Sequence, residues 1–97
     1  MIGRALAAAI GIIAIAAAVV ASAEPPAGAA SCSGCHPASP RVMSPVPRLA
    51  GVDRAAMVRA MQDFRSGQRA ATVMDRIAKG FTDDEIQAIA AWFATQK

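Results

Sequence analysis

The sequence is short of the residues on which several classes of protein depend. Its 97 residues include no tyrosine, one tryptophan, one histidine and two cysteines. Without aromatic residues interleaved with a basic run, the chain lacks the stacking platforms of nucleic-acid-binding proteins. Two cysteines are too few for a disulfide-stapled toxin, and a hydrophobic content of 55% is too high for a disordered tail. The length allows one small domain and excludes a multidomain enzyme.

Charge is scarce as well. After residue 23 the chain carries nine lysines and arginines against seven acidic residues, a net charge of +2, so no nucleic-acid partner is expected. The simplest interpretation of the scattered charges is a solvated surface, and the alternative is that some of them steer an acidic protein partner. The charges considered for such a role are Arg41, Arg48, Arg69, Arg76 and Lys79.

The first 23 residues have the composition of a secretory signal peptide. They hold 19 hydrophobic residues, a positive charge at Arg4 and the small residues Ala21-Ser22-Ala23 before Glu24. We predict cleavage after Ala23, export to the periplasm and no stable membrane insertion of the cleaved chain. A retained anchor is the weaker alternative, because the apolar stretch falls just short of about 20 residues and consists mostly of alanine.

The sequence Cys32-Ser33-Gly34-Cys35-His36 is the strongest chemical signal in the chain. In an exported protein both thiols are expected to be bonded to something. Thiols three residues apart on a helical turn share a face, so Cys32 and Cys35 can reach the two vinyl groups of one haem. His36 then lies beneath the porphyrin and can ligate iron from the proximal side. The motif predicts one covalently bound haem c.

Three competing interpretations of this motif are weaker. A redox-active Cys32–Cys35 disulfide belongs at a helix start after a strand, and no convincing strand precedes Cys32. A zinc site needs a fourth ligand, whereas the chain has one histidine and no further cysteine. The third interpretation is that the motif occurs by chance, as any pattern of five residues can.

The segments around the motif are rich in proline. Residues 24–30 predict a flexible leader into a short helix that carries the cysteines. We expect that helix to end at His36, because Pro37 disfavours the α conformation of the residue before it. Residues 37–47 contain four prolines and predict a stiff loop without helix or strand.

Two helices are predicted directly after this loop. Asp53 is a suitable N-cap, and Gly67 a suitable stop, for a helix over residues 54–66. A brief helix is expected to begin at residue 72 or 73 and to run through Lys79, before Gly80.

The last helix is predicted from a capping box formed by Thr82 and Glu85, which places acidic residues in the first turn. Its apolar residues repeat at helical spacing, with Trp92 at the margin of the stripe. The domain over residues 31–97 is therefore expected to be all-α, with no strand and no internal repeat. The predicted buried residues are Met57, Val58, Met61 and Phe64 in the helix over 54–66, and Ile86, Ile89, Ala90 and Phe93 in the last helix.

A low-spin electron carrier needs a sixth iron ligand, and a methionine thioether is the candidate because there is no second histidine. Met74 is favoured, since it lies beside a helix start with a whole helix between it and the motif. Met57 and Met61 are four residues apart on a predicted buried face, where methionine fills gaps in a core. Met43 is close to the motif and needs a tight wrap to reach the opposite haem face. A core methionine or an open sixth site is the remaining alternative.

The proximal imidazole is expected to donate its Nδ1 proton to a backbone carbonyl of the proline loop. Pro47 is the favoured acceptor, because its ring presets the backbone and Leu49-Ala50-Gly51 returns the chain toward the haem. Pro45 is the alternative.

With these motifs, the chain resembles a class I cytochrome c over nearly all of residues 31–97. The resemblance rests on the cysteine motif, Pro47–Gly51, Phe64–Arg69, Ala71–Gly80 and Ala91-Trp92-Phe93. The last three stretches are most similar to the cytochrome subunit of flavocytochrome c sulfide dehydrogenase. Pro37 departs from this family, which usually has glycine after the haem histidine. Many of these subunits also carry two haem domains, whereas this chain has one motif.

The resemblance implies three to five short helices around one haem and a crossing of the first and last helices, with Trp92 or Phe93 packed there. It implies axial ligands His36 and Met74, thioether bonds at Cys32 and Cys35, and a Pro47 carbonyl that accepts from His36.

The expected function is one-electron transfer, in which the protein makes and breaks no bond. The first hypothesis is a non-catalytic subunit that accepts electrons from a sulfide-oxidising flavoprotein. The second is a free periplasmic shuttle that delivers electrons to an oxidase or reductase. The third is a haem sensor or enzyme with an open sixth site.

Overall fold

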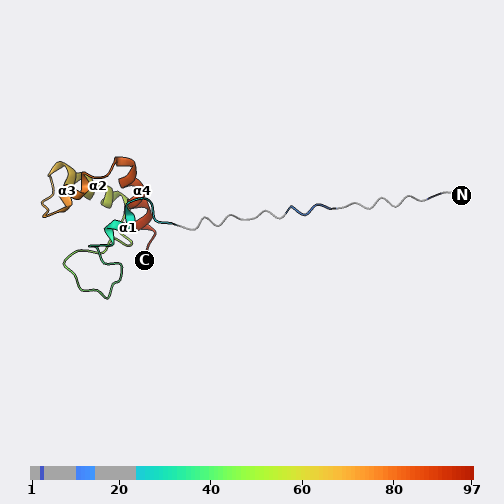
Figure 1. Cartoon of the computed structure of the whole chain (residues 1–97), viewed down its shortest axis with the longest axis horizontal. Helices are drawn as coiled ribbons and strands as arrows, with labels where there is room; N and C mark the ends of the chain where they lie inside the picture. Colours follow the sequence, from blue (N-terminus) through green and yellow to red (C-terminus); the bar gives the residue numbers. More distant parts are fainter. Residues whose placement is uncertain (1–2, 4–10, 15–23) are drawn as a thin grey trace.

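The computed structural model describes residue 3, residues 11–14 and residues 24–97, and it has four helices in these residues. They are α1 (Ala29–Cys32), α2 (Arg54–Ser66), α3 (Met74–Ala78) and α4 (Asp83–Ala94). Figure 1 shows them gathered in one body, from which the loop after α1 protrudes. The described residues contain no strand, so the predicted all-α fold is confirmed.

The predicted signal peptide lies almost entirely outside the described residues. Of residues 1–23, only residue 3 and residues 11–14 are described, and Ile12 and Ile13 are exposed. None of the helices in the described part of the chain combines the length and the apolar character that crossing a membrane requires. Cleavage after Ala23 stays a prediction.

The two long helices have the caps that the sequence predicts. The Asp53 carboxylate accepts a hydrogen bond of 3.0 Å from the Ala56 N–H, and Gly67 ends α2 with a φ of 80°. At α4 the Thr82 N–H donates to Glu85 Oε1 at 3.0 Å, and the Glu85 N–H donates to the Thr82 hydroxyl at 3.2 Å. The bond that the Glu85 carboxylate accepts from the Thr82 N–H, and after it the Thr82 side chain, lowers the pKa of Glu85. The starts of both helices are therefore predicted correctly.

The first helix is shorter than predicted. α1 ends at Cys32 and not at His36, because the N–H groups of residues 33–35 bond carbonyls three residues back and tighten the chain into a turn. The His36 N–H still donates to the Cys32 carbonyl at 2.9 Å. The second cysteine thus lies in the turn after the helix, and the motif keeps the compactness of one helical turn.

α3 is also slightly shorter than expected. It covers five residues, Met74–Ala78, because Val73 serves as its N-cap and Lys79 as its C-cap. Helix ends of this kind fray easily, and α3 is held in place by packing against α2.

A small apolar core lies where α1, α2 and α4 meet. Phe93 is 6% exposed and Ala29 is fully buried, so the first and last helices meet there, as the resemblance implies. The Trp92 and Phe93 rings form an edge-to-face pair with centroids 4.8 Å apart. The four apolar residues predicted in α4 are all buried, whereas Met61 and Phe64 of α2 are only partly so. The core cluster consists of Ala29, Met57, Val58, Ile86, Ile89, Ala90 and Phe93.

The packed part of the chain begins at Gly28, within the segment predicted as a flexible leader. Gly28 has a φ of 87°, and a Cβ added to it lies 2.6 Å from a ring carbon of Phe81 and 3.5 Å from Ile89. The fully buried Ala29 follows it. Only glycine combines this backbone conformation with so close an approach to an aromatic ring.

Replacing Gly28 by alanine is expected to lower the free energy of unfolding by about 2–5 kcal/mol, since left-handed backbone costs about 1–2 kcal/mol and overpacking about 1–3 kcal/mol. The matched control is Gly67→Ala, because Gly67 has a similar φ of 80° and an added Cβ there meets no described atom within 4 Å. Urea unfolding of the haem-bound proteins measures both losses. Equal losses in the two variants contradict the proposed contact with Phe81.

Candidate functional site

The two cysteines are presented by α1 and the turn after it. Both are free thiols, Cys32 half-buried and Cys35 exposed. The Cys32 thiol donates to the Gly28 carbonyl at 3.6 Å, and burial raises its pKa. The Cys32 sulfur is therefore a protonated thiol at neutral pH, and both sulfurs are free to bond a group outside the turn.

The His36 imidazole is fixed by the far end of the proline loop. Its Nδ1 lies 2.5 Å from the Pro47 carbonyl oxygen. Because a carbonyl only accepts hydrogen bonds, Nδ1 must carry a proton and donate it, so in the neutral imidazole the lone pair is on Nε2. Of the two acceptors considered from the sequence, Pro47 and not Pro45 makes this contact. The ring thus offers one nitrogen to a metal and has the other engaged.

The proline loop is shaped by serine side chains and anchored at its end. The N–H groups of Arg41 and Val46 donate to the hydroxyl oxygens of Ser39 and Ser44 at 3.2 Å and 3.1 Å, which are local turns in place of regular structure. After the loop, the Gly51 N–H donates to the Phe93 carbonyl at 2.9 Å. This bond ties the loop exit to the end of α4, beside His36.

Arg48 also contacts this region, a role that the sequence did not reveal. Its guanidinium donates to the carbonyl of Ala38 and to the main-chain oxygen of Lys97. The sequence placed Arg48 among the surface charges. Its position directly after Pro47, the favoured partner of His36, was the one available signal.

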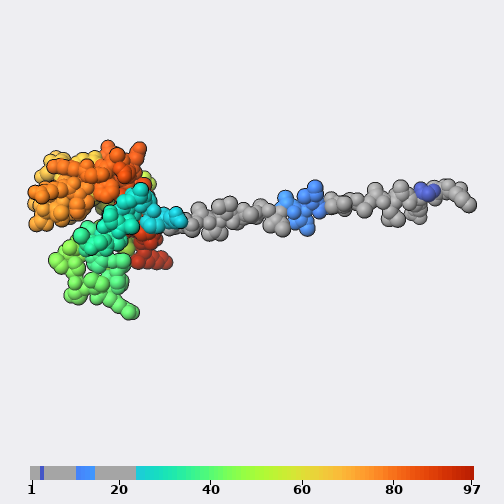
Figure 2. Space-filling view, in the orientation of Figure 1, coloured from blue at the N-terminus to red at the C-terminus, as the bar shows by residue number. Residues whose placement is uncertain are grey.

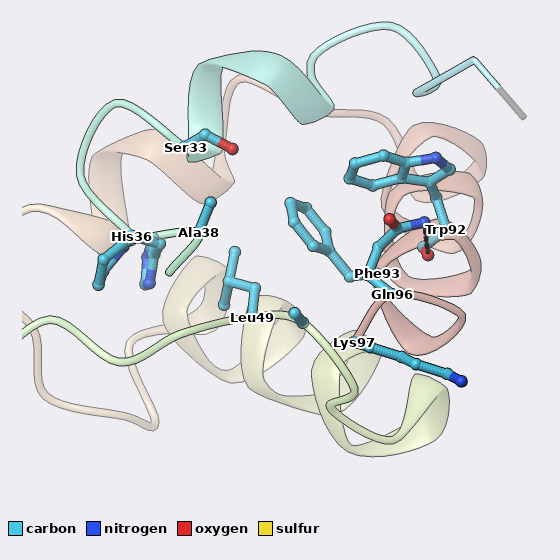
Figure 3. Close-up of a pocket in the computed structure, with 10 residues that line it drawn as sticks. Ser33, His36, Ala38, Leu49, Trp92, Phe93, Gln96 and Lys97 are labelled. Atoms are coloured by element: carbon cyan, nitrogen blue, oxygen red, sulfur yellow. Dashed lines mark hydrogen bonds between the residues drawn. The ribbon is translucent and has the colours of Figure 1, made fainter. Parts of the chain in front are cut away.

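A pocket opens between the start of the loop and the end of α4. Figure 3 shows the Leu49 side chain and the Phe93 ring pointing into the space beside His36. The Trp92 Nε1 is buried and has no hydrogen-bond partner among the described residues. The pocket is lined by Ser33, His36, Pro37, Ala38, Leu49, Ala50, Trp92, Phe93, Gln96 and Lys97.

Exposed apolar side chains lie on the two segments that carry the proline loop and α3. Val42 and Met43 in the loop are 54% and 95% exposed, and Val73 and Ile77 around α3 are 49% and 39% exposed. Figure 2 shows the segments that contain them, the green loop and the yellow-to-orange segment around α3, as two masses with a notch between them. An apolar group bound against these side chains would remove apolar surface from water, which is favourable.

The four methionines after residue 23 have four different environments. Met57 is 8% exposed in the core cluster, and Met61 packs against that cluster. Met43 is almost completely exposed in the loop. Met74 is half-buried at the first residue of α3, three residues before the exposed Ile77 and therefore on the same side of the helix.

These donors fit haem c. Two free thiols at the required spacing suit its two vinyl groups, and an imidazole with a free Nε2 suits its iron. The exposed apolar side chains of the loop and around α3 suit the faces of a porphyrin, and Trp92, whose buried N–H has no partner among the described residues, lines the His36 pocket. The structure brings Cys32, Cys35, His36 and Pro47 together, and it holds Met74 on a separate segment, at the start of α3.

Comparison with known proteins gives relatives that are cytochromes, whereas no protein-family model matches the chain. The chain is 41% identical over 63 residues to the cytochrome subunit of sulfide dehydrogenase of Chlorobaculum tepidum, covering 65% of this chain and 57% of that protein. It is 40% identical over 65 residues to the thiosulfate dehydrogenase electron acceptor of Stutzerimonas stutzeri, covering 65% and 30%. It is 30% identical over 71 residues to cytochrome c-554(548) of Halomonas halodenitrificans, covering 69% and 86%.

The chain thus spans little more than half of the first relative and less than a third of the second, but most of the third. The helical fold, the cysteine motif and this coverage agree. The chain belongs to the class I c-type cytochromes, electron-transfer proteins with covalently bound haem c.

Proposed function

We propose that the chain is an exported cytochrome with one haem, which accepts electrons from the flavoprotein subunit of a sulfide dehydrogenase. The observation that carries the electron-transfer role is the contact of 2.5 Å between His36 Nδ1 and the Pro47 carbonyl, beside two free thiols. The sulfide dehydrogenase partner is supported by the 41% identity to a cytochrome subunit of that enzyme.

The proposed ligands are His36 and Met74, and the proposed thioether bonds are at Cys32 and Cys35. The haem iron, when bound, supplies one-electron chemistry between its ferrous and ferric states. His36 offers Nε2, and the carbonyl on Nδ1 orients the ring and raises its basicity. The residues of this chain make and break no bond in the transfer, so the role is non-catalytic.

Met74 is the proposed sixth ligand because of its half-buried position on a segment separate from that of His36. Met57 and Met61 are engaged in the core, and moving either of them opens a cavity there. Met43 lies in the same loop that holds His36 through Pro47, seven residues from the histidine. Met74 is half-buried and comes from a different segment, on the side of α3 that presents Ile77. Met74 would thus supply a second donor to the iron from a segment independent of the one that would supply His36.

A free periplasmic shuttle is the second candidate function. It is favoured by the match to cytochrome c-554(548), of which the chain covers 86%. The part of that relative outside this 86% is too short for a second haem domain. The two candidates share the same haem site and differ in whether a flavoprotein stays bound.

Purification of the exported chain from the cells that produce it, at low ionic strength, separates these functions. We expect a flavin-containing protein to co-elute with the haem in a fixed ratio, and sulfide to reduce the haem faster in this complex than in the isolated chain. A chain that elutes alone at its monomer mass, without flavin and with no faster reduction in the extract, contradicts the subunit role and supports the shuttle.

A further inference from the structure

We propose that Arg48 is a positioning residue for the proximal histidine, which clamps the two ends of the proline loop to each other and to the chain after α4. The inference rests on the proposed role of His36 as an iron ligand. It assigns a function in the site to a residue that otherwise counts as one more surface charge.

The clamp consists of three hydrogen bonds from one guanidinium. Arg48 Nε and Nη2 donate to the Ala38 carbonyl at 3.2 Å and 2.9 Å, and Nη2 also donates to the Lys97 main-chain oxygen at 3.3 Å. Arg48 is half-buried, whereas a charged side chain without contacts to the protein is exposed. Hydrogen bonds from a charged donor are stronger than those between neutral groups, and the planar guanidinium fixes their direction.

The clamp and the histidine contact form a reciprocal pair. The His36 side chain reaches across the loop to the Pro47 carbonyl, and the side chain of the next residue, Arg48, reaches back to the Ala38 carbonyl. Only Pro37, whose φ is fixed by its ring, separates His36 from Ala38. A shift of the Ala38 carbonyl therefore moves the backbone of the histidine itself.

Backbone pairing does not hold the loop ends together. Pro37 and Pro47 have no N–H to donate, and in the described residues no backbone hydrogen bond joins residues 36–38 to residues 46–48. The two side-chain contacts take over this task. Without Arg48, the distance from His36 to Pro47 depends on the stiffness of the loop alone.

The Lys97 bond extends the clamp to a third segment. Lys97 and Gln96 line the same pocket as His36, Pro37 and Ala38. Arg48 thus fixes the wall of that pocket formed by the chain after α4, in addition to the loop. Exchange of the His36 Nδ1 proton with water requires its bond to the Pro47 carbonyl to break, so a clamp that holds the loop ends together slows that exchange.

The test compares Arg48→Ala with the control Arg41→Ala in the full-length, haem-bound protein. Arg41 is an exposed residue of the proline loop and Arg48 follows that loop directly, so both variants lose one positive charge from this part of the chain. Exchange of the His36 Nδ1 proton, measured by NMR, is expected to be roughly tenfold faster in Arg48→Ala and unchanged in Arg41→Ala. The reduction potential of Arg48→Ala is expected to lie above that of Arg41→Ala, because a weakened Nδ1 bond makes the imidazole a poorer donor.

Arg48→Lys keeps the charge and one of the hydrogen bonds, so its exchange rate is expected to fall between those of the parent and Arg48→Ala. If Arg48→Ala yields no haem-bound protein, this variant decides: exchange faster than in the parent supports the clamp, and the parent rate overturns it. Equal exchange and equal potential in Arg48→Ala and Arg41→Ala overturn the inference while His36 ligation stands. A parent spectrum without histidine ligation overturns the proposed role of His36, and the inference with it, whereas a spectrum that lacks only methionine ligation overturns the role of Met74 alone.

Discussion

Replacing Met74 by alanine is expected to abolish the sulfur-to-iron charge-transfer band of the oxidised protein. The reduction potential is expected to fall by on the order of a few tenths of a volt, part of the range of about 0.8 V that axial ligands cover. The physical reason is that a thioether stabilises the ferrous state, whereas water or hydroxide in its place favours the ferric state. The variant should also bind carbon monoxide readily in its ferrous form.

The other methionines provide matched controls for this prediction. Met43→Ala removes a thioether from a position that is 95% exposed, and it should leave both the band and the potential unchanged. Met61→Ala removes a side chain packed against the core, and it should lower stability without loss of the band. Met74→His tests the position itself, since it should restore six-coordinate iron at a lower potential than the parent.

Retention of the band in Met74→Ala, or its loss in Met43→Ala, contradicts the proposed ligand. Carbon monoxide binding by the parent, at the rate of the alanine variant, points to an open sixth site and favours the sensor over the electron carrier. The alanine series therefore distinguishes a carrier from a haem sensor without knowledge of the partner protein.

The elements that the sequence predicted well are those defined by local signals. The starts of α2 and α4 follow from Asp53 and from the Thr82–Glu85 capping box, whose partners lie within three residues of each other. The buried stripe of α4 follows from its helical period. The acceptor of His36 lies 11 residues away in the proline loop, where only the carbonyls of Pro45 and Pro47 were considered.

The features that the sequence did not reveal depend on contacts between distant residues. Arg48 meets Lys97 across 49 positions, and Gly28 meets Phe81 across an even longer separation. Arg65 donates to the Phe81 carbonyl at 2.6 Å and pairs with Asp83, which joins the end of α2 to the start of α4. No periodicity or cap motif encodes such contacts, because they exist only once the helices have packed. The early end of α1 has a different cause, since α and 3₁₀ hydrogen bonds are close in energy at a helix end.

The chain without haem is expected to be largely unfolded. The test is the double variant Cys32→Ser/Cys35→Ser, which cannot form either thioether. We expect it to lose most of the helical signal in circular dichroism and the slow amide exchange of α2 and α4. The single variant Cys35→Ser keeps the half-buried Cys32, which can still form one thioether, so this variant should remain folded with reduced stability.

The physical reason is the small size of the core. Three of its eight buried residues are alanines, and no large side chain in the described residues is fully buried. α2 and α4 have 13 and 12 residues, and helices of about 12–15 residues or fewer are marginal in water without packing partners. The proline loop and the segment around α3 also leave Val42, Met43, Val73 and Ile77 exposed, so these apolar side chains add nothing to the core. Small domains of this kind commonly depend on a bound group for their stability.

A cooperative melting transition and protected amides in the haem-free double variant contradict this prediction. Such a result means that the contacts of Ala29 and Phe93 between the first and last helices suffice to hold the fold, and that haem is bound by a preformed site. The expected result instead makes haem attachment and folding one event, because the proposed ligands His36 and Met74 and the proposed thioethers would join segments that the polypeptide alone holds together weakly. Under that result, the free energy of unfolding of the holoprotein measures mainly the contacts with haem. A core substitution such as Ile89→Ala then lowers this free energy by its own independent amount only while the haem stays ligated.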